Sequence, residues 1–471
     1  MNGARVAERV SVGLRLGTGK TVITPPVGSN LSGFIARVAP MIGIHDDLYA
    51  RAMVWAEEGS SAIAALLTLD LIDLDAASVT AIRDRAAALT GIPAAQIGVT
   101  CTHTHGGPAT PAGRWLGRCS PEYLATLCAT AAGAVAIAAS HTESVVMRWA
   151  CGTEQTVGKN RRIAGGAIDP DVPVLRFARH DGTVTAVLTS YACHPVTLGP
   201  DNLLATADYP GYIVRTLEAT YPGALALFAT GACGQINTGH TARDGVQGRG
   251  SDWRTYAEAE RLGRTVAGAA MQAAEAAARD DAALPVSVHP IRHAHLRTAR
   301  RTVPMPMLPI ATPSEARALA DGWRAEREQL EHVGANGGET GPYRVGEEWA
   351  AALVAGTLPP TTTAEIMVIA LGDVALVLLP GEVFVEYGLA IKAHAAPRPV
   401  ITLAYANGTP GYIPHRSAYA EGGYEVTDAY RYYGTPACFA PEAGEAVVAA
   451  ACALLDALVD VPAMQPISNT R

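Results

Sequence analysis

Gln96-Ile97-Gly98-Val99-Thr100-Cys101 is a short apolar run, and Thr102-His103-Thr104-His105-Gly106-Gly107-Pro108 follows it directly. The apolar run predicts a buried strand, and the glycines and proline predict a turn after it. Side chains two residues apart on a strand point to the same face, so His103 and His105 face the same way. Two imidazoles at the end of a buried strand are typical of a metal site, and two polar histidines in a turn are the alternative.

The order of elements around this strand recurs twice later in the chain. The pattern is a two-stranded hairpin, then a helix, then one more strand. The copies have hairpins at residues 52–56 and 62–69, 174–178 and 184–191, and 366–370 and 374–379; helices at 76–89, 211–220 and 383–395; and last strands at 96–101, 224–229 and 400–404. We therefore predict an α/β fold with mixed sheets, built from three related hairpin-helix-strand units in a single large domain.

A polar residue follows the second strand of each hairpin: Asp70, His194 and Glu382. In α/β layers, binding sites gather at the carboxyl ends of strands, so we expect these ends to converge with the strand that carries His103 and His105. Histidine and carboxylate ligands with one open coordination position are typical of a catalytic zinc site. The alternatives are a strand cap for His194 and a solvated turn acid for Glu382.

The composition is that of a large globular protein. The chain has 471 residues, of which 49% are hydrophobic and 17% are charged. The net charge of -8 argues against nucleic acid as the main partner. Eight cysteines without a Cys-x-x-Cys pair fit neither a zinc ribbon nor a small secreted disulfide scaffold. No segment reads as a signal peptide or an uninterrupted transmembrane run, so we expect a cytoplasmic protein without membrane insertion.

One region differs from the rest of the chain. Residues 296–360 are charged and punctuated by proline. Within them, Thr312-Pro313-Ser314-Glu315 fits a capping box with proline at the first helical position, which predicts a helix to about His332. We expect a helical insertion around residues 296–360 in one catalytic domain that spans residues 1–471.

A series of short motifs extends along almost the whole chain. They are Val22-Ile23-Thr24-Pro25-Pro26, Tyr49-Ala50-Arg51-Ala52, Thr102-His103-Thr104-His105-Gly106-Gly107-Pro108, Asn160-Arg161, the loop at His194, Pro380-Gly381-Glu382, Gly411-Tyr412 and Gly423-Tyr424-Glu425. Together they resemble the neutral/alkaline (non-lysosomal) ceramidase family, in its catalytic N-terminal domain, over roughly residues 17–449. The Thr-His-Thr-His-x-Gly-Pro motif is the most specific part of the resemblance.

The resemblance implies a metal-dependent hydrolase with a defined set of site residues. It assigns zinc binding to His103, His194, Glu382 and Tyr412, proton transfer near the metal to His105, and oxyanion stabilisation to Arg161 and Tyr424. These roles are chemically coherent, because zinc makes hydroxide available near neutral pH and polarises a carbonyl. An arginine and a phenol directed at a developing oxyanion add electrostatic stabilisation.

The residues themselves leave other interpretations open. Arg161 is flanked by other basic residues and could belong to a solvated basic turn. Tyr412 and Tyr424 lie in a tyrosine-rich stretch and could be packing residues. The sequence assigns no role to His45, Asp46 or Asp70.

The chain departs from the family pattern in two respects. Ceramidases carry a serine in a Gly-Asp-Val-Ser-Pro-Asn motif, whereas residues 231–237 here contain no serine. Its role would be absent or would fall to Gln235, Asn237 or backbone amides. We also expect neither the family's C-terminal β-sandwich domain nor its secretion signal. These departures favour a small soluble substrate over ceramide.

Three functions remain in competition at this point. The first is zinc-dependent hydrolysis of a carbon–nitrogen amide bond of a small molecule by metal-activated water. The second is zinc-dependent hydrolysis of an ester or lactone, or a lyase reaction, on a polar or sugar-like substrate. The third is a non-catalytic, metal-stabilised binding protein, which would need every coordination position filled. The sequence predicts neither the substrate nor the oligomeric state.

Overall fold

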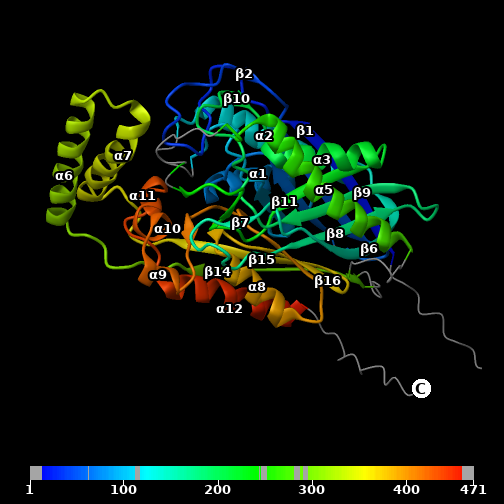
Figure 1. Ribbon diagram of the computed structural model, residues 1–471. Coiled ribbons are helices and arrows are strands. Elements are labelled where there is room, and N and C mark those ends of the chain that lie inside the picture. The colour runs from blue at the N-terminus through cyan, green and yellow to red at the C-terminus, as the bar shows by residue number, and fades with distance from the viewer. Residues whose placement is uncertain are drawn as a thin grey trace, which may run out of the picture.

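The computed structural model describes residues 13–61, 63–111, 117–242, 244, 252–279, 287–289 and 295–458. These residues form four layers, in which two β-sheets pack face to face and helices cover the outer face of each (Figure 1). In this part of the chain the larger sheet has nine strands and the smaller has four. The predicted α/β fold with mixed sheets is confirmed. The two termini of the 1–471 domain prediction lie outside the described residues.

Each predicted unit contains one more strand and one more helix than its sequence pattern indicated. The first unit is β1 (Leu14–Val22), β3 (Tyr49–Glu57), β4 (Ile63–Leu69), α1 (Ala76–Thr90), β5 (Ile97–Cys101) and α2 (Pro121–Ser140); the second is β6 (Glu143–Thr153), β8 (Asp171–Ala178), β9 (Val184–Tyr191), α3 (Asp208–Thr220), β11 (Leu225–Thr230) and α5 (Tyr256–Arg279); the third is β14 (Leu296–Pro304), β15 (Thr363–Leu371), β16 (Val374–Leu378), α8 (Val385–Ala395), β18 (Val400–Leu403) and α12 (Pro441–Leu458). The three units therefore share one order of elements.

Strand pairing is also the same in the three units. The first three strands are antiparallel, and the last strand, after its helix, pairs parallel to the third. The first two units join through β1 and β6 into the larger sheet, and β13 (Ser287–His289) adds to β6. The third unit alone makes the smaller sheet, ordered β14-β15-β16-β18. The three predicted hairpin-helix-strand units are thus present.

The helical insertion is narrower than the predicted 296–360. Residues 296–304 form β14, an edge strand of the smaller sheet, so they belong to the third unit. The helical part is α6 (Pro313–His332) followed by α7 (Gly337–Val354), which pack against each other at one edge of the molecule (Figure 1). The predicted capping box of α6 is present at Thr312 and Glu315.

Short elements complete the path around the strand ends. They are β2 (Gly43–Ile44) with β10 (Leu204–Ala205), β7 (Lys159–Asn160) with β12 (Ile236–Asn237), β17 (Glu382–Val383) with β19 (Tyr412–Ile413), the 3-10 helix η1 (Ala94–Gln96), and the short helices α9 (Ala418–Glu421), α10 (Tyr424–Thr427) and α11 (Ala429–Tyr432). Each of the three two-residue strand pairs joins segments that are distant in sequence. Through these pairs the loops at the strand ends are hydrogen-bonded to one another.

Helix α2 packs unusually close to β1. A side chain at Gly19 would place its Cβ atom 2.1 Å from the carbonyl oxygen of Ala134, and one at Gly17 would lie 1.8 Å from that of Ala138. The second unit repeats this contact, because a Cβ at Gly152 on β6 would lie 2.6 Å from the carbonyl oxygen of Ala269 on α5. By length and composition α2 is apolar enough to cross a membrane, and here the buried part of its surface packs on the larger sheet.

We predict that Gly19→Ala lowers the free energy of unfolding by about 1–3 kcal/mol, because the added methyl group meets helix backbone that cannot move aside locally. Gly133→Ala, on α2 itself, is the matched control, because its Cβ would meet nothing within 4 Å. That control should raise the free energy of unfolding by roughly 0.5–1 kcal/mol through helix propensity. Urea unfolding measures both variants, and equal effects of one sign would contradict the close approach of α2 and β1.

Candidate metal centre and active-site pocket

The parallel strands of the three units meet at their carboxyl ends. The backbone N–H of Ala404, after β18, donates to the carbonyl of Thr230 at the end of β11 at 2.8 Å. The Thr100 hydroxyl on β5 donates to the carbonyl of Ala404 at 2.8 Å, and the Thr230 hydroxyl donates to the carbonyl of Thr102 at 2.6 Å. This junction brings residues from three distant parts of the chain to one place, as the repeat predicted.

His103 leaves β5 in a left-handed backbone conformation, with φ of 66°. A non-glycine residue adopts this region rarely, and such strain persists where surrounding contacts fix it. Its Nδ1 atom hydrogen-bonds the carbonyl of Ile72 at 2.7 Å, which leaves Nε2 directed at Glu382, 3.4 Å from Oε2. Tyr405, also at positive φ, stacks on the His103 ring with centroids 3.9 Å apart. The orientation of the imidazole is therefore fixed by the stacked Tyr405 ring on its face and by the hydrogen bond at Nδ1.

His194 is oriented in the same way by the backbone. Its Nδ1 atom lies 2.9 Å from the carbonyl oxygen of Cys233 and 3.0 Å from that of Ile236, and its Nε2 atom lies 2.8 Å from Glu382 Oε2. Burial lowers the pKa of His194 to about 4, against the opposing hydrogen bond from Glu382. The ring is neutral at physiological pH, as a metal ligand must be. A carbonyl partner on the outer nitrogen is the usual arrangement behind metal-binding histidines.

Glu382 completes a group of three buried residues. Its carboxylate and the ring nitrogens of His103 and His194 all lie within 4.8 Å of one another. Burial alone would raise the pKa of Glu382, yet His103 and His194 hold it well below its usual value, so the carboxylate is charged. Its other oxygen, Oε1, accepts a short hydrogen bond from the hydroxyl of Tyr433. Two imidazoles and a carboxylate form a donor set that suits zinc. We refer to His103, His194 and Glu382 together as the metal group.

Tyr412 lies beside this group through strand pairing. It is the register partner of Glu382 in the pair β17 and β19. Its ring runs nearly parallel to that of His194, with centroids 6.5 Å apart, and its hydroxyl accepts a hydrogen bond from Arg161 Nη2 at 3.0 Å. The role of Tyr412 as a fourth ligand, which the resemblance implied, stays a prediction.

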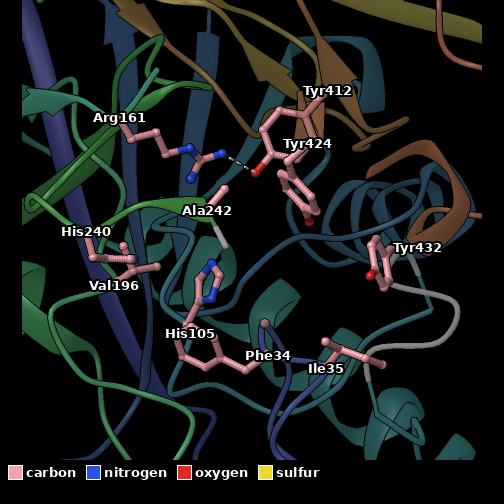
Figure 2. Close-up of a pocket in the computed structure, with 11 residues that line it drawn as sticks. Phe34, Ile35, His105, Arg161, Val196, His240, Ala242, Tyr412, Tyr424 and Tyr432 are labelled. Carbon is pink, nitrogen blue, oxygen red and sulfur yellow. Dashed lines mark hydrogen bonds between the residues drawn. The ribbon is translucent and has the colours of Figure 1, made fainter. Parts of the chain in front are cut away.

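The pocket in front of the metal group is lined by the remaining predicted residues (Figure 2). Its lining consists of Gly33, Phe34, Ile35, His105, Arg161, Val196, His240, Ala242, Tyr412, Tyr424 and Tyr432. Figure 2 shows Arg161, Tyr412 and Tyr424 on one side and His105 across from them. The cavity volume is about 50 Å³, enough for a few water molecules. The pocket is therefore narrow beside the metal group.

His105 projects into this pocket without a committed partner. Both of its ring nitrogens are shielded from solvent and make no hydrogen bond among the described residues. Burial, with the neighbouring histidines, lowers the pKa of His105 well below its usual value. The ring of Phe34 packs against it at 4.8 Å, and Arg37 donates to its backbone carbonyl at 2.8 Å. His105 is therefore a positioned imidazole that can exchange a proton with a molecule in the pocket.

Arg161 is buried, so the interpretation of a solvated basic turn is wrong. Its side chain is 6% exposed and donates from Nε to Glu425 at 2.8 Å and from Nη2 to the carbonyl of Gly234 at 3.0 Å. The ring of Tyr424 lies perpendicular to that of Tyr412, with centroids 5.7 Å apart. Burial raises the pKa of Tyr424 well above its usual value, so its hydroxyl keeps its proton. Both side chains can donate hydrogen bonds into the pocket.

The candidate replacements for the missing serine are used elsewhere. Gln235 accepts a hydrogen bond from the backbone of Val385 at 3.0 Å and donates to Glu386 at 2.6 Å. The Asn237 side chain bonds the backbone of His240 and Gly239 within its own loop. Both residues are buried and neither lines the pocket. They shape the loop that carries Cys233, and no serine substitute is visible in them.

The other polar residues without a predicted role lie outside the metal group. Asp70 is buried and pairs with Arg51 at 3.2 Å, so its strand end contributes an ion pair where the other two contribute candidate ligands. Asp46 accepts hydrogen bonds from Thr206 at 2.5 Å and from the backbone of Ala207 at 3.1 Å. His45 contacts Asp46 at 2.8 Å. These groups link β2, β4 and α3 around the pocket loops.

Sequence reasoning missed several side chains that support the site. Tyr433 and Tyr405 were counted only among packing aromatics, and Phe34 and Asp73 were not considered. Asp73 is buried close enough to His103 and Glu382 for their charges to act on it, and burial raises its pKa to about 6. The repeat carried a signal for Tyr405, because it follows β18 at the same distance as His103 follows β5.

The fold and site define an α/β protein with a buried His-His-Glu group beside a pocket, next to the pocket residues His105 and Tyr412. No family model and no curated protein matches the sequence. Solved structures do match in fold, and two ceramidases are among them. The neutral ceramidase from Pseudomonas aeruginosa is 20% identical, with a TM-score of 0.70 over 97% of this chain and 76% of that chain. A ceramidase complexed with C2 is 19% identical, with a TM-score of 0.71 over 97% of this chain and 77% of that one. The ceramidase-like fold expected from the sequence motifs is confirmed.

We predict that His194→Ala and Glu382→Ala each remove tightly bound zinc from the folded protein, because each variant leaves only two of the three buried His and Glu ligands. The wild type should carry about one zinc per chain after metal loading. Metal analysis of purified, folded protein, with circular dichroism to establish folding, measures the result. Full zinc content in either variant would show that the ligand set is wrong.

Two further variants serve as graded controls. Asp70→Asn removes a buried carboxylate at an equivalent strand end and should lower stability while keeping the zinc content. Tyr433→Phe removes only the hydrogen bond to Glu382, and loss of such outer contacts weakens metal affinity by roughly 10–100-fold. Competition with a chelator distinguishes this weakening from the complete loss expected of the ligand variants.

Proposed function

We propose that this protein is a zinc-dependent amide hydrolase that acts on a small soluble substrate. One observation carries the proposal: His103, His194 and Glu382 converge next to His105 and Tyr412, which line a pocket together with Arg161 and Tyr424. Water would add across a carbon–nitrogen bond and release a carboxylic acid and an amine. The ceramidases that share the fold support this reaction class.

The chain's own residues fit a zinc ion. Both histidines are fixed through Nδ1 to backbone carbonyls, so the Nε2 atoms are free to bind metal, and the carboxylate of Glu382 brings one negative charge. Tyr412 would provide a fourth donor. Bound zinc lowers the pKa of water to near neutrality and polarises a carbonyl group.

Each pocket residue has a separate task in the proposed reaction. His105, neutral and without a partner, would accept a proton from the attacking water and deliver it to the leaving amine. Arg161 and Tyr424 would donate hydrogen bonds to the oxygen that becomes negative as the amide carbon turns tetrahedral. The ion pair with Glu425 holds Arg161 in place before the substrate binds, so little reorganisation is needed.

A small substrate agrees with the size of the pocket. The cavity of about 50 Å³ beside the metal group leaves room for a compact acyl group. Burying a long lipid tail needs a large apolar groove, because each Å² of apolar contact contributes only about 25 cal/mol.

We also propose that the protein is cytoplasmic, in keeping with eight cysteines that are all free.

We expect His105→Ala to keep its zinc but to turn over amides roughly 10²–10⁴-fold more slowly, the usual contribution of a positioned proton-transfer group. Steady-state kinetics together with metal analysis tests this. Loss of zinc along with activity would identify His105 as a ligand. Phe34→Leu is a matched control for the packing around the imidazole and should slow turnover less than His105→Ala.

A substrate panel tests the proposed function as a whole. The zinc-loaded protein should hydrolyse at least one small soluble amide, and should prefer it by kcat/KM over detergent-dispersed ceramide. Preference for ceramide would restore the lipid substrate. Preference for esters or lactones would move the reaction to oxygen leaving groups with the same site residues. No turnover of any compound by a fully zinc-loaded protein would favour a binding protein.

A further inference from the structure

Two arginines lie directly behind one wall of the active-site pocket. Phe34 and Val196 form part of that wall. The guanidinium carbons of Arg37 and Arg254 lie 4.9 Å and 5.4 Å from the centroid of the Phe34 ring. Arg254 also donates from Nη2 to the backbone carbonyl of Val196 at 3.1 Å. Both cations therefore contact residues that a bound substrate would touch.

Neither cation has a carboxylate partner within 4.0 Å in the described part of the chain, which distinguishes both from Arg161 and Arg51. Arg37 donates to the carbonyls of Ser32 and His105, and Arg254 donates to those of Val196, Thr197 and Leu198. Arg37 Nε and Arg254 Nη1 are shielded from solvent and make no hydrogen bond there. Arg254 is only 7% exposed. Two positive charges are thus held together next to the pocket and only partly solvated by backbone.

Three acidic groups, Asp208, Asp201 and Asp244, act on Arg254 from beyond ion-pair distance and offset only part of the lowering of its pKa by burial. Asp208 is buried, and its two oxygens accept from the backbone of Leu198 and Tyr209. Asp244 accepts from the backbone and hydroxyl of Thr241. Asp201 acts on Arg37 from a greater distance and is exposed. Burial lowers the pKa of Arg37 to about 9, because Asp201 offsets only part of the desolvation and Arg254 adds repulsion.

His240 adds a hydrogen-bonding group on the same side of the pocket. It lines the pocket, and its Nδ1 atom is shielded and without a hydrogen-bond partner among the residues the structure describes. Burial and the charges of Arg254 and Arg161 lower the pKa of His240 to about 3, so its ring is neutral and can donate one hydrogen bond. Figure 2 shows His240 and Val196 together on the side of the pocket away from Tyr432.

We infer that the substrate is an anion: an amide that carries a carboxylate, which lies against Phe34, Val196 and His240 in the field of Arg37 and Arg254. This inference rests on the proposed function and specifies its substrate class. A cleft with low-dielectric walls and charge of one sign concentrates ligands of the opposite sign. The two buried arginines behind this wall contrast with the net charge of -8 of the whole chain. His240 supplies the direct contact, and the two arginines supply the charge behind it.

Matched pairs of amides test the inference on the wild-type zinc protein. One pair is N-acetylglycine and N-acetylethanolamine, which differ mainly in a carboxylate against a hydroxymethyl group on the amine side. The other pair places the same difference on the acyl side: an N-succinyl amine and its 4-hydroxybutanoyl counterpart. At least one carboxylate should be favoured tenfold or more in kcat/KM, and added salt should reduce the preference. Equal or weaker turnover of both carboxylates would overturn the inference.

Arg254→Gln should reduce that preference by tenfold or more. Arg264→Gln removes the same charge from the exposed face of α5, where the arginine side chain is 68% exposed, and should keep the preference. Arg254→Lys keeps the positive charge and should keep most of the preference for the carboxylate amide. This variant provides a second measurement if Arg254→Gln folds poorly. Loss of preference in Arg264→Gln as large as in Arg254→Gln would contradict a local effect.

A binding measurement separates this inference from the proposed function. Calorimetry of succinate with the zinc-loaded protein should show at least tenfold weaker binding to Arg254→Gln than to Arg264→Gln, whether or not any amide is hydrolysed. If no amide is turned over but this difference is present, the hydrolase proposal fails and the anion site stands. If amides are turned over but succinate binds both variants equally, the anion site fails and the hydrolase proposal stands.

Discussion

The structure depends on the hydrogen bonds that join the ends of β5, β11 and β18. Because these bonds fix three parallel strands to one point, the segments after them have little freedom. His103 and Tyr405 both turn away in left-handed conformations, and their rings stack on each other. His194 and Glu382 are 188 residues apart in sequence, yet they are in contact. His194 follows β9, which pairs with β11, and Glu382 follows β16, which pairs with β18, and β11 and β18 both end at this junction. The metal group is thus a consequence of how the three units pack.

Electrostatics and packing support each other at this point. A buried carboxylate is costly unless a cation or hydrogen-bond donors compensate it. The Tyr433 hydroxyl provides part of that compensation for Glu382, and a divalent cation would provide the rest. Backbone carbonyls orient the rings of His103 and His194, because a hydrogen bond at Nδ1 leaves Nε2 as the nitrogen that faces Glu382. A site built this way holds its geometry without metal and gains stability when metal binds.

The sequence predicted the parts of this arrangement that are local. Hydrophobic period and turn residues identified the three units. The position after a hairpin identified His194 and Glu382, and the position after the last strand of the first unit identified His103. β14 was assigned to the insertion because an edge strand exposed on one face, with the sequence Leu296 to Pro304, looks like charged surface. Tyr433 and Phe34 were missed because their roles come from contacts made only after the loops pack. Asp70 shows the limit of the repeat, because an equivalent position carries an ion pair with Arg51 in place of a ligand.

The metal group and the pocket wall are built by different kinds of structure, and this separates chemistry from specificity. The ligands sit at strand ends, where the junction fixes them, whereas Phe34, Val196 and His240 belong to loops between elements. Loops tolerate changes that strand ends at a packed junction do not. The fold is shared at about 20% identity, and the loops are therefore the part of this chain most open to sequence change. Arg37 ties two pocket residues together, since one guanidinium donates to the backbone carbonyl of His105 and packs on Phe34.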